Sequence, residues 1–361
     1  MRRSPLMNHI LRSTGLLAGA VGVFLLACGC IAPRESVRPP EPPTPQGTLP
    51  QETPELDPAR LYAKLKRASV EIIVDGHLAG SGWFADSSGL IVTAAHMMNG
   101  WGAKIEVVRQ SSDPLPARVL AVDQGHDLAL LRLKQSGTEL AFEALEVAES
   151  MPGPGQDVYL FGSALYRHRI MLRGSVARDD LTYEFLGDRG HFVRVYHVAS
   201  PSPPGTSGGC WTDARGRVVG VQSAFITNNG KSTGIADVAP PDAIHSLLRT
   251  RESARTPTLG CGLEELPTQQ PGFIRRLPEG TGGLVTIPIQ AGGPADKAGL
   301  NKESVIVALD GQPVRYRDEF LDRIRRKDPG EEVTLKIIQP DEKKHRVVKI
   351  KLENLESPWS H

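Results

Sequence analysis

Three short motifs in the middle of the chain carry residue types that could perform nucleophilic catalysis. His96 ends a Thr-Ala-Ala-His run, Asp127 precedes four apolar residues, and Ser207 lies in a Gly-Thr-Ser-Gly-Gly run. A serine hydroxyl is a weak nucleophile and needs a base within hydrogen-bond reach, and histidine titrates in the useful range. A buried carboxylate then fixes the imidazole tautomer. The order His, Asp, Ser, with separations of 31 and 80 residues, predicts a catalytic triad assembled from three loops.

The glycines around Ser207 predict a second part of such a site. Glycine lets the backbone bend sharply, so that several N–H groups can point at one spot. We expect Gly205, Thr206 and Ser207 to form an oxyanion hole, with the N–H groups of Gly205 and Ser207 as its donors. Each motif alone has a structural explanation, as a strand end, a cap or a hairpin turn. All three together, in this order, favour the catalytic interpretation.

Two neighbouring residues offer competing assignments. Cys210 follows the second glycine and could act as a thiol nucleophile, but Ser207 is present, so we expect Cys210 to be a small buried thiol. His126 precedes Asp127 and could be mistaken for the base. Because adjacent residues on a strand face opposite ways, we expect His126 at the surface.

The elements that must position these residues are short apolar runs separated by turn residues. Two sets of strands with Gly-rich turns predict two β-barrels in tandem. A helix over 242–249 follows two prolines, which are tolerated at a helix start. The predicted strands are 69–74, 90–93, 105–108, 118–122 and 128–133 in the first set, and 158–161, 169–176, 192–198 and 218–225 in the second.

Length and composition agree with a globular protein that is mostly β. The 361 residues suggest two domains at about 150 residues each. With 42 Lys and Arg against 41 Asp and Glu, the net charge is +1, which argues against bulk binding to nucleic acid. Aromatic residues make up only 5%, beside 37 glycines and 29 prolines, and this favours turn-rich β structure. The four cysteines form no C-x-x-C pair, so the sequence offers no zinc or thioredoxin-like motif.

The N-terminus has the parts of an export signal. Three arginines precede an apolar run over 15–27, which ends in Leu-Leu-Ala before Cys28. This end resembles the lipobox of bacterial lipoproteins, which implies cleavage after residue 27 and lipid on Cys28. An uncleaved membrane helix is the alternative. Either way the rest of the chain is expected outside the cytoplasm. Residues 28–58 would be the lipidated end and a Pro-rich linker.

The motifs together resemble trypsin-like serine proteases, and most closely the bacterial HtrA (Deg) group. The resemblance rests on Gly80–Phe84 and Gly89–His96 for the first barrel, on Asp127–Leu131, and on Pro204–Gly209 followed by Gly216–Ala224 and Gly234–Pro240. It implies a mainly β fold, with a two-barrel chymotrypsin/trypsin-like protease domain over 59–252. Thr206 and Cys210 depart from the group, which usually has Asn and Pro at these places.

The resemblance also implies a substrate pocket. Its expected contacts are Ser202, Pro203, Pro204, Gln222, Ser223 and Ala224. Tryptic enzymes carry an acidic residue some six positions before the serine, but the stretch 199–204 contains none. We therefore expect a preference for small or medium apolar residues before the scissile bond. The charged segment 164–190 corresponds to regulatory loops in the group.

The C-terminal part resembles the permuted PDZ domain that follows HtrA proteases. Its expected range is 257–353, as a small α+β domain with strands over 304–309, 333–338 and 347–352 and helical spacing over 318–326. Leu259, Gly260, Cys261 and Gly262 match the carboxylate-binding loop, whose backbone N–H groups would hold a peptide C-terminus. The alternative is a small domain that only packs between subunits.

These features predict an ATP-independent serine endopeptidase of the cell envelope that cleaves unfolded or damaged proteins. The sequence contains no phosphate-binding P-loop and no H-E-x-x-H motif, and we expect neither a cofactor nor a metal. The expected partners are unfolded polypeptides, peptide C-termini at the PDZ domain and a membrane through the lipid anchor. Nucleic acid is not expected. By resemblance we expect a homo-oligomer, a trimer. The alternative function is a proteolytically silent envelope chaperone or scaffold protein.

Overall fold

The computed structural model describes residues 54–98, 104–110, 112–134, 141–187 and 189–355. Residues 52–361 belong to one compact unit. The predicted signal peptide, Cys28 and most of the Pro-rich linker lie outside the described residues. Within the ranges that are described, no helix is long and apolar enough to cross a bilayer.

A short amphipathic helix, α1 (Pro58–Ala68), precedes the first barrel, and the sequence analysis did not predict it. Asp57 Oδ1 caps its start by accepting the N–H groups of Ala59 and Arg60, both at 3.0 Å. Proline at the first helical position costs no hydrogen bond there. The buried side chains of Leu61 and Leu65 pack into the same hydrophobic cluster as Trp83 and Val218.

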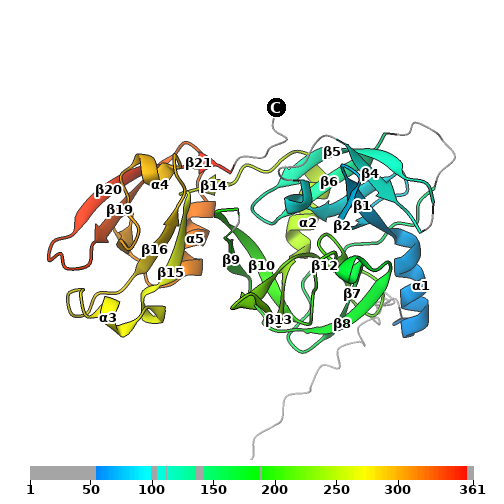
Figure 1. Ribbon diagram of the computed structural model, residues 1–361, viewed down its shortest axis with the longest axis horizontal. Coiled ribbons are helices and arrows are strands. Elements are labelled where there is room, and N and C mark those ends of the chain that lie inside the picture. Colours follow the sequence, from blue (N-terminus) through cyan, green and yellow to red (C-terminus); the bar gives the residue numbers. More distant parts are fainter. Residues whose placement is uncertain (1–53, 99–103, 111, 135–140, 188, 356–361) are drawn as a thin grey trace, which may run out of the picture. The chain divides into compact units, whose positions relative to one another are not determined.

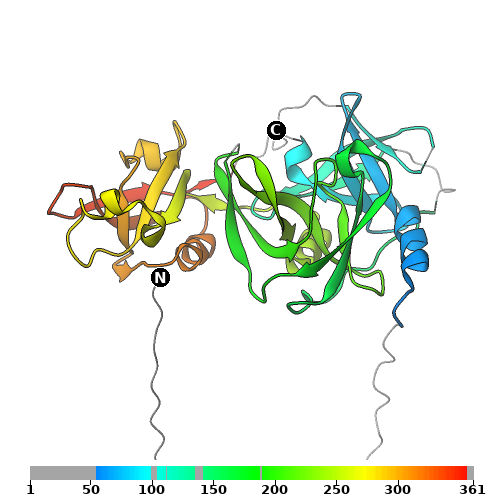
Figure 2. The ribbon, with the colours of Figure 1, turned by 60° about the horizontal axis from the view of Figure 1, so that its bottom comes forward.

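Six antiparallel strands form a closed first barrel in the order β1-β2-β3-β6-β5-β4. Figures 1 and 2 show these strands in blue and cyan beside the green strands that follow. Three predicted strands have the expected bounds. The strands are β1 (Ser69–Val74), β2 (His77–Phe84), β3 (Leu90–Ala94), β4 (Ile105–Val108), β5 (Leu115–Asp123) and β6 (Leu128–Leu133).

Seven strands form the second sheet, in the order β13-β12-β11-β7-β8-β10-β9, and pairing of β13 with β10 closes it. The fully buried Trp211 and Tyr196 lie in its core, and the Tyr196 hydroxyl donates to Val219 O at 2.9 Å. Helix α2 (Pro241–Thr250) follows it. The strands are β7 (Asp157–Gly162), β8 (Ile170–Val176), β9 (Thr182–Leu186), β10 (His191–Ala199), β11 (Cys210–Thr212), β12 (Val218–Asn228) and β13 (Lys231–Ala239).

The C-terminal region is a small sheet with helices. Its main strands follow the order β15-β16-β17-β19-β20, with β18 beside β17, and β14 pairs with β21. The buried face of α5 (Arg317–Arg325) carries Phe320, Leu321 and Ile324. The strands are β14 (Pro257–Thr258), β15 (Cys261–Glu265), β16 (Leu284–Ile289), β17 (Val305–Leu309), β18 (Gln312–Pro313), β19 (Glu332–Ile338), β20 (Arg346–Lys351) and β21 (Glu353–Asn354), and the short helices are α3 (Pro271–Ile274) and α4 (Pro294–Lys297).

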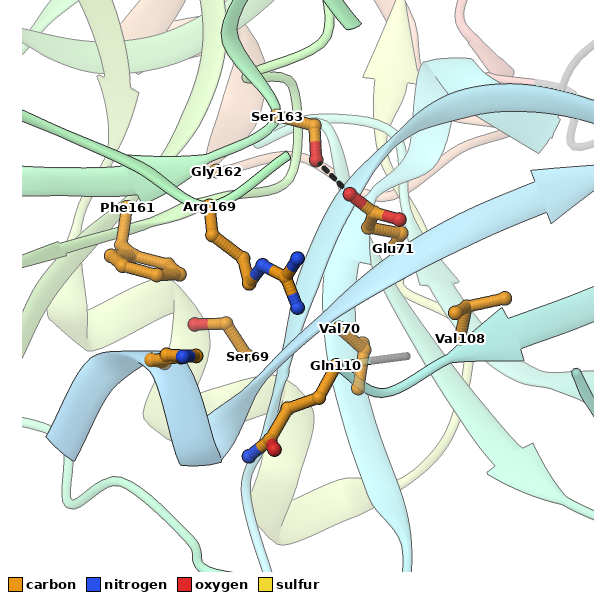
Figure 3. A pocket seen from close by; sticks show the side chains of 10 residues that line it. Ser69, Val70, Glu71, Val108, Gln110, Phe161, Gly162, Ser163 and Arg169 are labelled. Carbon is orange, nitrogen blue, oxygen red and sulfur yellow. Dashed lines mark hydrogen bonds between the residues drawn. The ribbon is translucent and has the colours of Figure 1, made fainter. Parts of the chain in front are cut away.

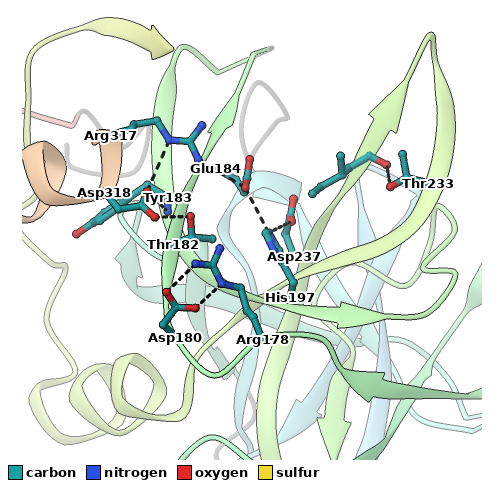
Figure 4. Close-up of polar contacts among 11 residues, drawn as sticks. Arg178, Asp180, Thr182, Tyr183, Glu184, His197, Thr233, Asp237, Arg317 and Asp318 are labelled. Carbon is teal, nitrogen blue, oxygen red and sulfur yellow. Dashed lines mark hydrogen bonds and ion pairs between the residues drawn. The ribbon is translucent and has the colours of Figure 1, made fainter. Parts of the chain in front are cut away.

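Strand β9 contacts helix α5 through side chains that the sequence analysis did not use (Figure 4). Asp318 accepts the Thr182 hydroxyl at 2.8 Å and the Tyr183 N–H at 3.2 Å. The Tyr183 hydroxyl donates to Asp322 at 2.9 Å. Tyr183 and Phe192 are buried in the hydrophobic cluster that contains Phe320. The hairpin β9–β10 and the C-terminal region therefore share one hydrophobic core.

The predicted fold class is confirmed, as a mainly β structure with two barrels and a smaller mixed domain. The strand predictions missed β2, β9, β11, β15 and β16, and also the two-residue strands β14, β18 and β21. Segment 164–190, treated as loops apart from 169–176, also contains β9, whose residues Thr182–Leu186 pair with β10.

Candidate active site

His96 lies directly after β3, in the short 3₁₀ turn η1 (Ala95–Met98). The turn is fixed to the loop before β6, because the Ala95 N–H donates to Asp127 O at 3.0 Å and the His96 N–H donates to Asp127 Oδ1 at 2.8 Å. His96 Nδ1 lies 2.7 Å from Asp127 Oδ2. A proton on Nδ1 leaves Nε2 as the proton acceptor, which is the tautomer a general base requires.

Asp127 is buried, with 2% of its side chain exposed, and its backbone has a positive φ of 56°. A non-glycine residue in this region is strained and needs support from its surroundings. The Ser223 hydroxyl donates to Asp127 Oδ2 at 2.5 Å, beside the two contacts from His96. Burial would raise the pKa of Asp127, but these contacts hold its pKa below the ordinary value of a carboxyl. Asp127 is therefore charged and oriented.

Ser207 reaches the same cleft as His96. The cleft has a volume of 360 Å³, and Pro204, Gly205, Ser223 and Ala224 also line it. Among the described residues, no hydrogen bond joins Ser207 Oγ to His96. Such contacts are commonly long in substrate-free enzymes and tighten when substrate binds. The structure thus brings together the three residues that the sequence motifs predicted.

The backbone around Ser207 leaves two N–H groups without a protein acceptor. Within the described part of the chain, these are the N–H groups of Gly205 and Ser207. Thr206 is different, because both its N–H, at 3.2 Å, and its hydroxyl, at 2.7 Å, donate to Pro203 O. Of the predicted hole residues Gly205, Thr206 and Ser207, Thr206 therefore contributes no donor, and a hole formed by the expected donors Gly205 and Ser207 stays a prediction.

Three of the six predicted substrate contacts line the cleft, namely Pro204, Ser223 and Ala224. Gln222 is buried instead, where its side-chain oxygen accepts Trp211 Nε1 at 2.9 Å and its nitrogen donates to Ala224 O at 2.6 Å. Ser202 is also buried, and neither it nor Pro203 lines the cleft. Gln222 therefore supports the strand beside the cleft, and a direct contact of substrate with Ser202 or Pro203 stays a prediction.

Sequence reasoning missed most of the apolar lining of the cleft. These residues come from strand β2, from η1, from the segment after β7, from the end of β9 and the turn after it, and from strand β12, and no single motif joins them. They are Leu78, Ala79, Met97, Tyr166, Leu186 and Phe225, together with Arg189. Mostly apolar lining suits an apolar substrate side chain.

The two competing residues have structural roles. Cys210 is fully buried in the core, 3.9 Å from the Ser69 hydroxyl, and burial raises the pKa of its thiol to about 12, so it is not a ready nucleophile. The prediction that Cys210 is a buried thiol is confirmed. His126 lies only partly at the surface, and strand alternation is not the reason. His126 belongs to a turn and not to a strand, its side chain is 23% exposed, and its Nδ1 lies 2.8 Å from Asp123 Oδ2.

The predicted carboxylate-binding loop lies at the start of β15. Leu259 and Cys261 are buried in the domain core, and burial raises the pKa of the Cys261 thiol to about 12. Gly260 has a positive φ of 68°, and its N–H donates to Thr258 Oγ1 at 3.1 Å. A Cβ added at Gly262 would lie 3.2 Å from Phe185 Cζ. Peptide binding by this loop stays a prediction.

Comparison with known proteins agrees with this geometry. Residues 80–221 match the model of a trypsin-like peptidase domain, and residues 257–352 match the model of a PDZ domain. The chain is therefore built as a trypsin-like peptidase domain followed by a PDZ domain. In sequence the chain is similar to HtrA/DegP-type trypsin-like serine proteases, and in fold it is similar to an HtrA-type protease.

Three curated relatives illustrate the similarity. A probable periplasmic serine endoprotease DegP-like of Rhizobium meliloti is 30% identical over 71% of this chain. The putative serine protease HhoA of Synechocystis is 25% identical over 65% of this chain, and the serine protease HTRA1 of Xenopus laevis is 26% identical over 69%. This chain spans only 50%, 61% and 55% of the lengths of these three proteins.

Solved structures share the fold. The HtrA-type protease AlgW with a decapeptide superposes with a TM-score of 0.59 at 18% identity, over 84% of this chain and 100% of that chain. A serine endoprotease from Yersinia pestis gives a TM-score of 0.54 at 18% identity, over 86% of this chain and 100% of that chain.

Proposed function

We propose that this chain is a serine endopeptidase that uses His96, Asp127 and Ser207 as its catalytic triad. One observation carries the proposal: a buried, charged Asp127 orients His96 at a cleft that also holds Ser207 and two N–H groups without protein acceptors. A buried aspartate, an oriented histidine and a serine in one cleft are the geometry of acyl transfer to serine.

The chemistry follows from these contacts. Ser207 Oγ attacks the scissile carbonyl carbon while its proton passes to His96 Nε2. Asp127 stabilises the imidazolium that forms, and the N–H groups of Gly205 and Ser207 bind the oxyanion. His96 then gives its proton to the leaving amine. Water attacks the acyl-enzyme by the same route, with His96 again as the base, and regenerates Ser207.

We further propose that the substrates are unfolded or damaged polypeptides cleaved after small or medium apolar residues. No acidic side chain lines the described cleft, whereas Leu78, Met97 and Phe225 do. A lysine or arginine side chain would find no carboxylate partner there, and burying an unpaired charge is unfavourable. Unfolded chains expose apolar residues, which folded chains bury. Cleavage uses no nucleotide in this scheme.

The C-terminal domain is proposed to bind peptide C-termini through Leu259, Gly260, Cys261 and Gly262. A peptide would add as a strand while backbone N–H groups of this loop hold its carboxylate. The protein is also proposed to act as a homo-oligomer, a trimer by resemblance to the family. The size of the protein measured in solution without peptide tests the trimer. The same measurement with a C-terminal peptide tests whether the protein binds it.

The location is proposed to be the cell envelope, on its periplasmic or other extracytoplasmic side. Several curated relatives, four among those compared, carry the word periplasmic in their names. The residues before Cys28 have the pattern of a lipoprotein signal, so we propose lipid on Cys28. Labelling with a radioactive fatty acid tests this directly, because Cys28→Ala should abolish the label and release the protein from membranes.

Casein degradation by the protein lacking residues 1–30 tests the proposed activity. The wild-type protein should cleave casein, and Ser207→Ala should lose most of that activity while keeping its fold. Activity that is unchanged in Ser207→Ala would contradict the assignment of the nucleophile. An inactive wild-type protein that still binds unfolded chains would instead favour the silent chaperone.

A further inference from the structure

Ser81 of strand β2 touches the nucleophile loop at two places. The side chain is buried, with 1% of the residue exposed. Its hydroxyl donates to Gly205 O at 2.9 Å, and its N–H donates to Ser207 O at 2.8 Å. Its own carbonyl accepts the Thr93 hydroxyl at 2.7 Å, three residues before His96. Ser81 is thus bonded to both peptide groups that flank the Thr206–Ser207 unit.

The direction of the Ser81 hydroxyl is determined by its neighbours. The Ser163 N–H donates to Ser81 Oγ at 2.9 Å, so this oxygen acts as an acceptor towards Ser163. A hydroxyl has one proton, and a backbone carbonyl can only accept. The single proton of Ser81 therefore points at Gly205 O.

All five carbonyl groups of Pro203–Ser207 have donors, while the N–H groups of Gly205 and Ser207 have no protein acceptor within the described residues. The carbonyls thus hold the loop, and two N–H groups stay available for an oxyanion. Ser81 supplies two of the holding contacts. Pro203 O accepts from Thr206, Pro204 O from the Leu165 N–H at 2.7 Å, and Gly205 O from the Ser81 hydroxyl. Thr206 O accepts from the Gly209 N–H at 2.8 Å, and Ser207 O accepts from the Ser81 N–H.

The carboxylate of Glu71, in strand β1, supports this arrangement. The Ser163 hydroxyl donates to Glu71 Oε1 at 2.6 Å (Figure 3), and His168 Nδ1 lies 2.6 Å from the same oxygen. The packing around the loop is close. A Cβ added at Gly205 would lie 2.3 Å from Ser163 O, and one at Gly162 would lie 2.8 Å from Ser81 Oγ. The loop has little room to move while these contacts persist.

We propose that Ser81 is a positioning residue for the oxyanion hole, acting through Gly205 O and braced by Ser163 and Glu71. Removing the hydroxyl leaves Gly205 O buried without its donor, which is unfavourable. The Gly205–Thr206 peptide would then rotate to find another partner. Because this peptide lies between the two donor N–H groups, both would lose alignment with the oxyanion. This inference rests on the proposed peptidase function.

Peptide hydrolysis by Ser81→Ala tests the inference against a purely structural role. Loss of a whole oxyanion donor typically lowers the rate by about 10²–10³, so misalignment should lower kcat by about 10–100-fold. KM should change by less than about threefold, because the hole binds the transition state and not the ground state. Affinity for a peptide boronate, which resembles the tetrahedral intermediate, should fall in parallel with kcat/KM.

Matched variants separate positioning from folding. Ser69→Ala removes another buried serine, in β1, whose hydroxyl has Cys210 as its one side-chain partner among the described residues, and it should leave kcat within about twofold. Ser163→Ala keeps the backbone N–H that orients Ser81, so its loss of kcat should be smaller than that of Ser81→Ala. If Ser81→Ala does not fold, Ser81→Cys, with its weak donor, should show an intermediate loss of kcat.

Crystal structures of the wild-type protein and Ser81→Ala test the positioning role of Ser81 without a measurement of activity. The expected result is a rotated Gly205–Thr206 peptide in the variant, whether or not a peptide substrate is known. An unchanged peptide, or kcat and boronate affinity within about threefold of wild type in the folded variant, would overturn the inference. A wild-type protein that hydrolyses nothing, together with the rotated peptide in the variant, would contradict the proposed function and leave the positioning role supported.

Discussion

Asp127 holds His96 at two points, through Oδ2 at 2.7 Å from the ring nitrogen Nδ1 and through Oδ1 at 2.8 Å from the backbone nitrogen. The carboxylate therefore fixes both the plane of the imidazole and the turn that carries it. Ser223 donates to the same carboxylate, so three donors surround a buried negative charge. This unit is the most firmly defined part of the proposed site, and it gives the sharpest predictions.

Asp127→Asn should lower kcat by about 10⁴-fold with little change in fold, because an amide stabilises the wrong imidazole tautomer. Steady-state hydrolysis of a peptide measures this. Asp123→Asn is a matched control, since Asp123 pairs with His126 at 2.8 Å, away from the cleft lining. The control should keep kcat within about threefold of wild type. Equal losses in the two variants would contradict the assignment of Asp127.

Ser223→Ala should lower kcat/KM by about tenfold. The lost hydrogen bond goes to a charged group, and such bonds contribute about 1.5 kcal/mol. The hydroxyl also helps hold the pKa of Asp127 below its ordinary value, so its removal should raise that pKa. Peptide hydrolysis checks the loss of rate, and a variant with wild-type kcat/KM would count against the contact.

His197 should make folding stability depend on pH outside the catalytic cleft. His197 Nε2 lies 3.3 Å from Glu184 and 3.4 Å from Asp237, with Arg317 3.8 Å from Glu184 (Figure 4). Burial would lower the pKa of His197, but the two carboxylates raise it to about 9. The raised pKa means that the protonated ring stabilises the folded state fully below about pH 6.5 and loses this effect as pH rises towards 9.

Urea unfolding of wild type and His197→Gln at several pH values measures this. The difference in the free energy of unfolding should be on the order of 2 kcal/mol at pH 6 and should shrink towards pH 9.5. His168→Gln is the control, because that side chain is 60% exposed and exposed ion pairs contribute little. A difference in the free energy of unfolding that grows with pH would contradict the predicted direction of the pH dependence.

Two glycines with the same backbone conformation allow the cost of backbone strain to be measured apart from the cost of steric crowding. Gly208 and Gly155 have φ of 78° and 79°, but an added Cβ at Gly208 would lie 2.2 Å from Ser81 O, whereas nothing lies within 4 Å at Gly155. Gly155→Ala should cost about 1–2 kcal/mol of stability and no activity. Gly208→Ala should cost at least about 3 kcal/mol or prevent folding. Similar melting temperatures for the two variants would contradict the close packing around Ser207.

The three residues of the proposed triad could be found from sequence because each of them lies in a short motif whose neighbours define its loop. The strand over 69–74 was equally clear, since four of its six residues are valine or isoleucine. Helix α1 had a usable signal that was overlooked, with Asp57 as cap, Pro58 behind it, and Leu61 and Leu65 at helical spacing. These features are all local.

The remaining features depend on contacts between distant parts of the chain. From the sequence Tyr183 is expected in a loop, and nothing near it shows that its N–H donates to Asp318, 135 residues away. Ser81 is one serine among glycines, and nothing nearby shows that its hydroxyl reaches Gly205, 124 residues further on. Thr206 was assigned to the oxyanion hole because its neighbours belong there, but only the folded loop shows its N–H turned to Pro203.

Covalent labelling with a fluorophosphonate, followed by peptide mapping, tests the central claim most directly. The reagent reacts with a serine hydroxyl activated by a base and leaves an oxygen in the oxyanion hole. We predict one label per chain, on Ser207, that is absent in Ser207→Ala and at least about a hundredfold slower in Asp127→Asn. Unchanged labelling of Ser207→Ala, or no reaction of the folded wild-type protein, would contradict the account.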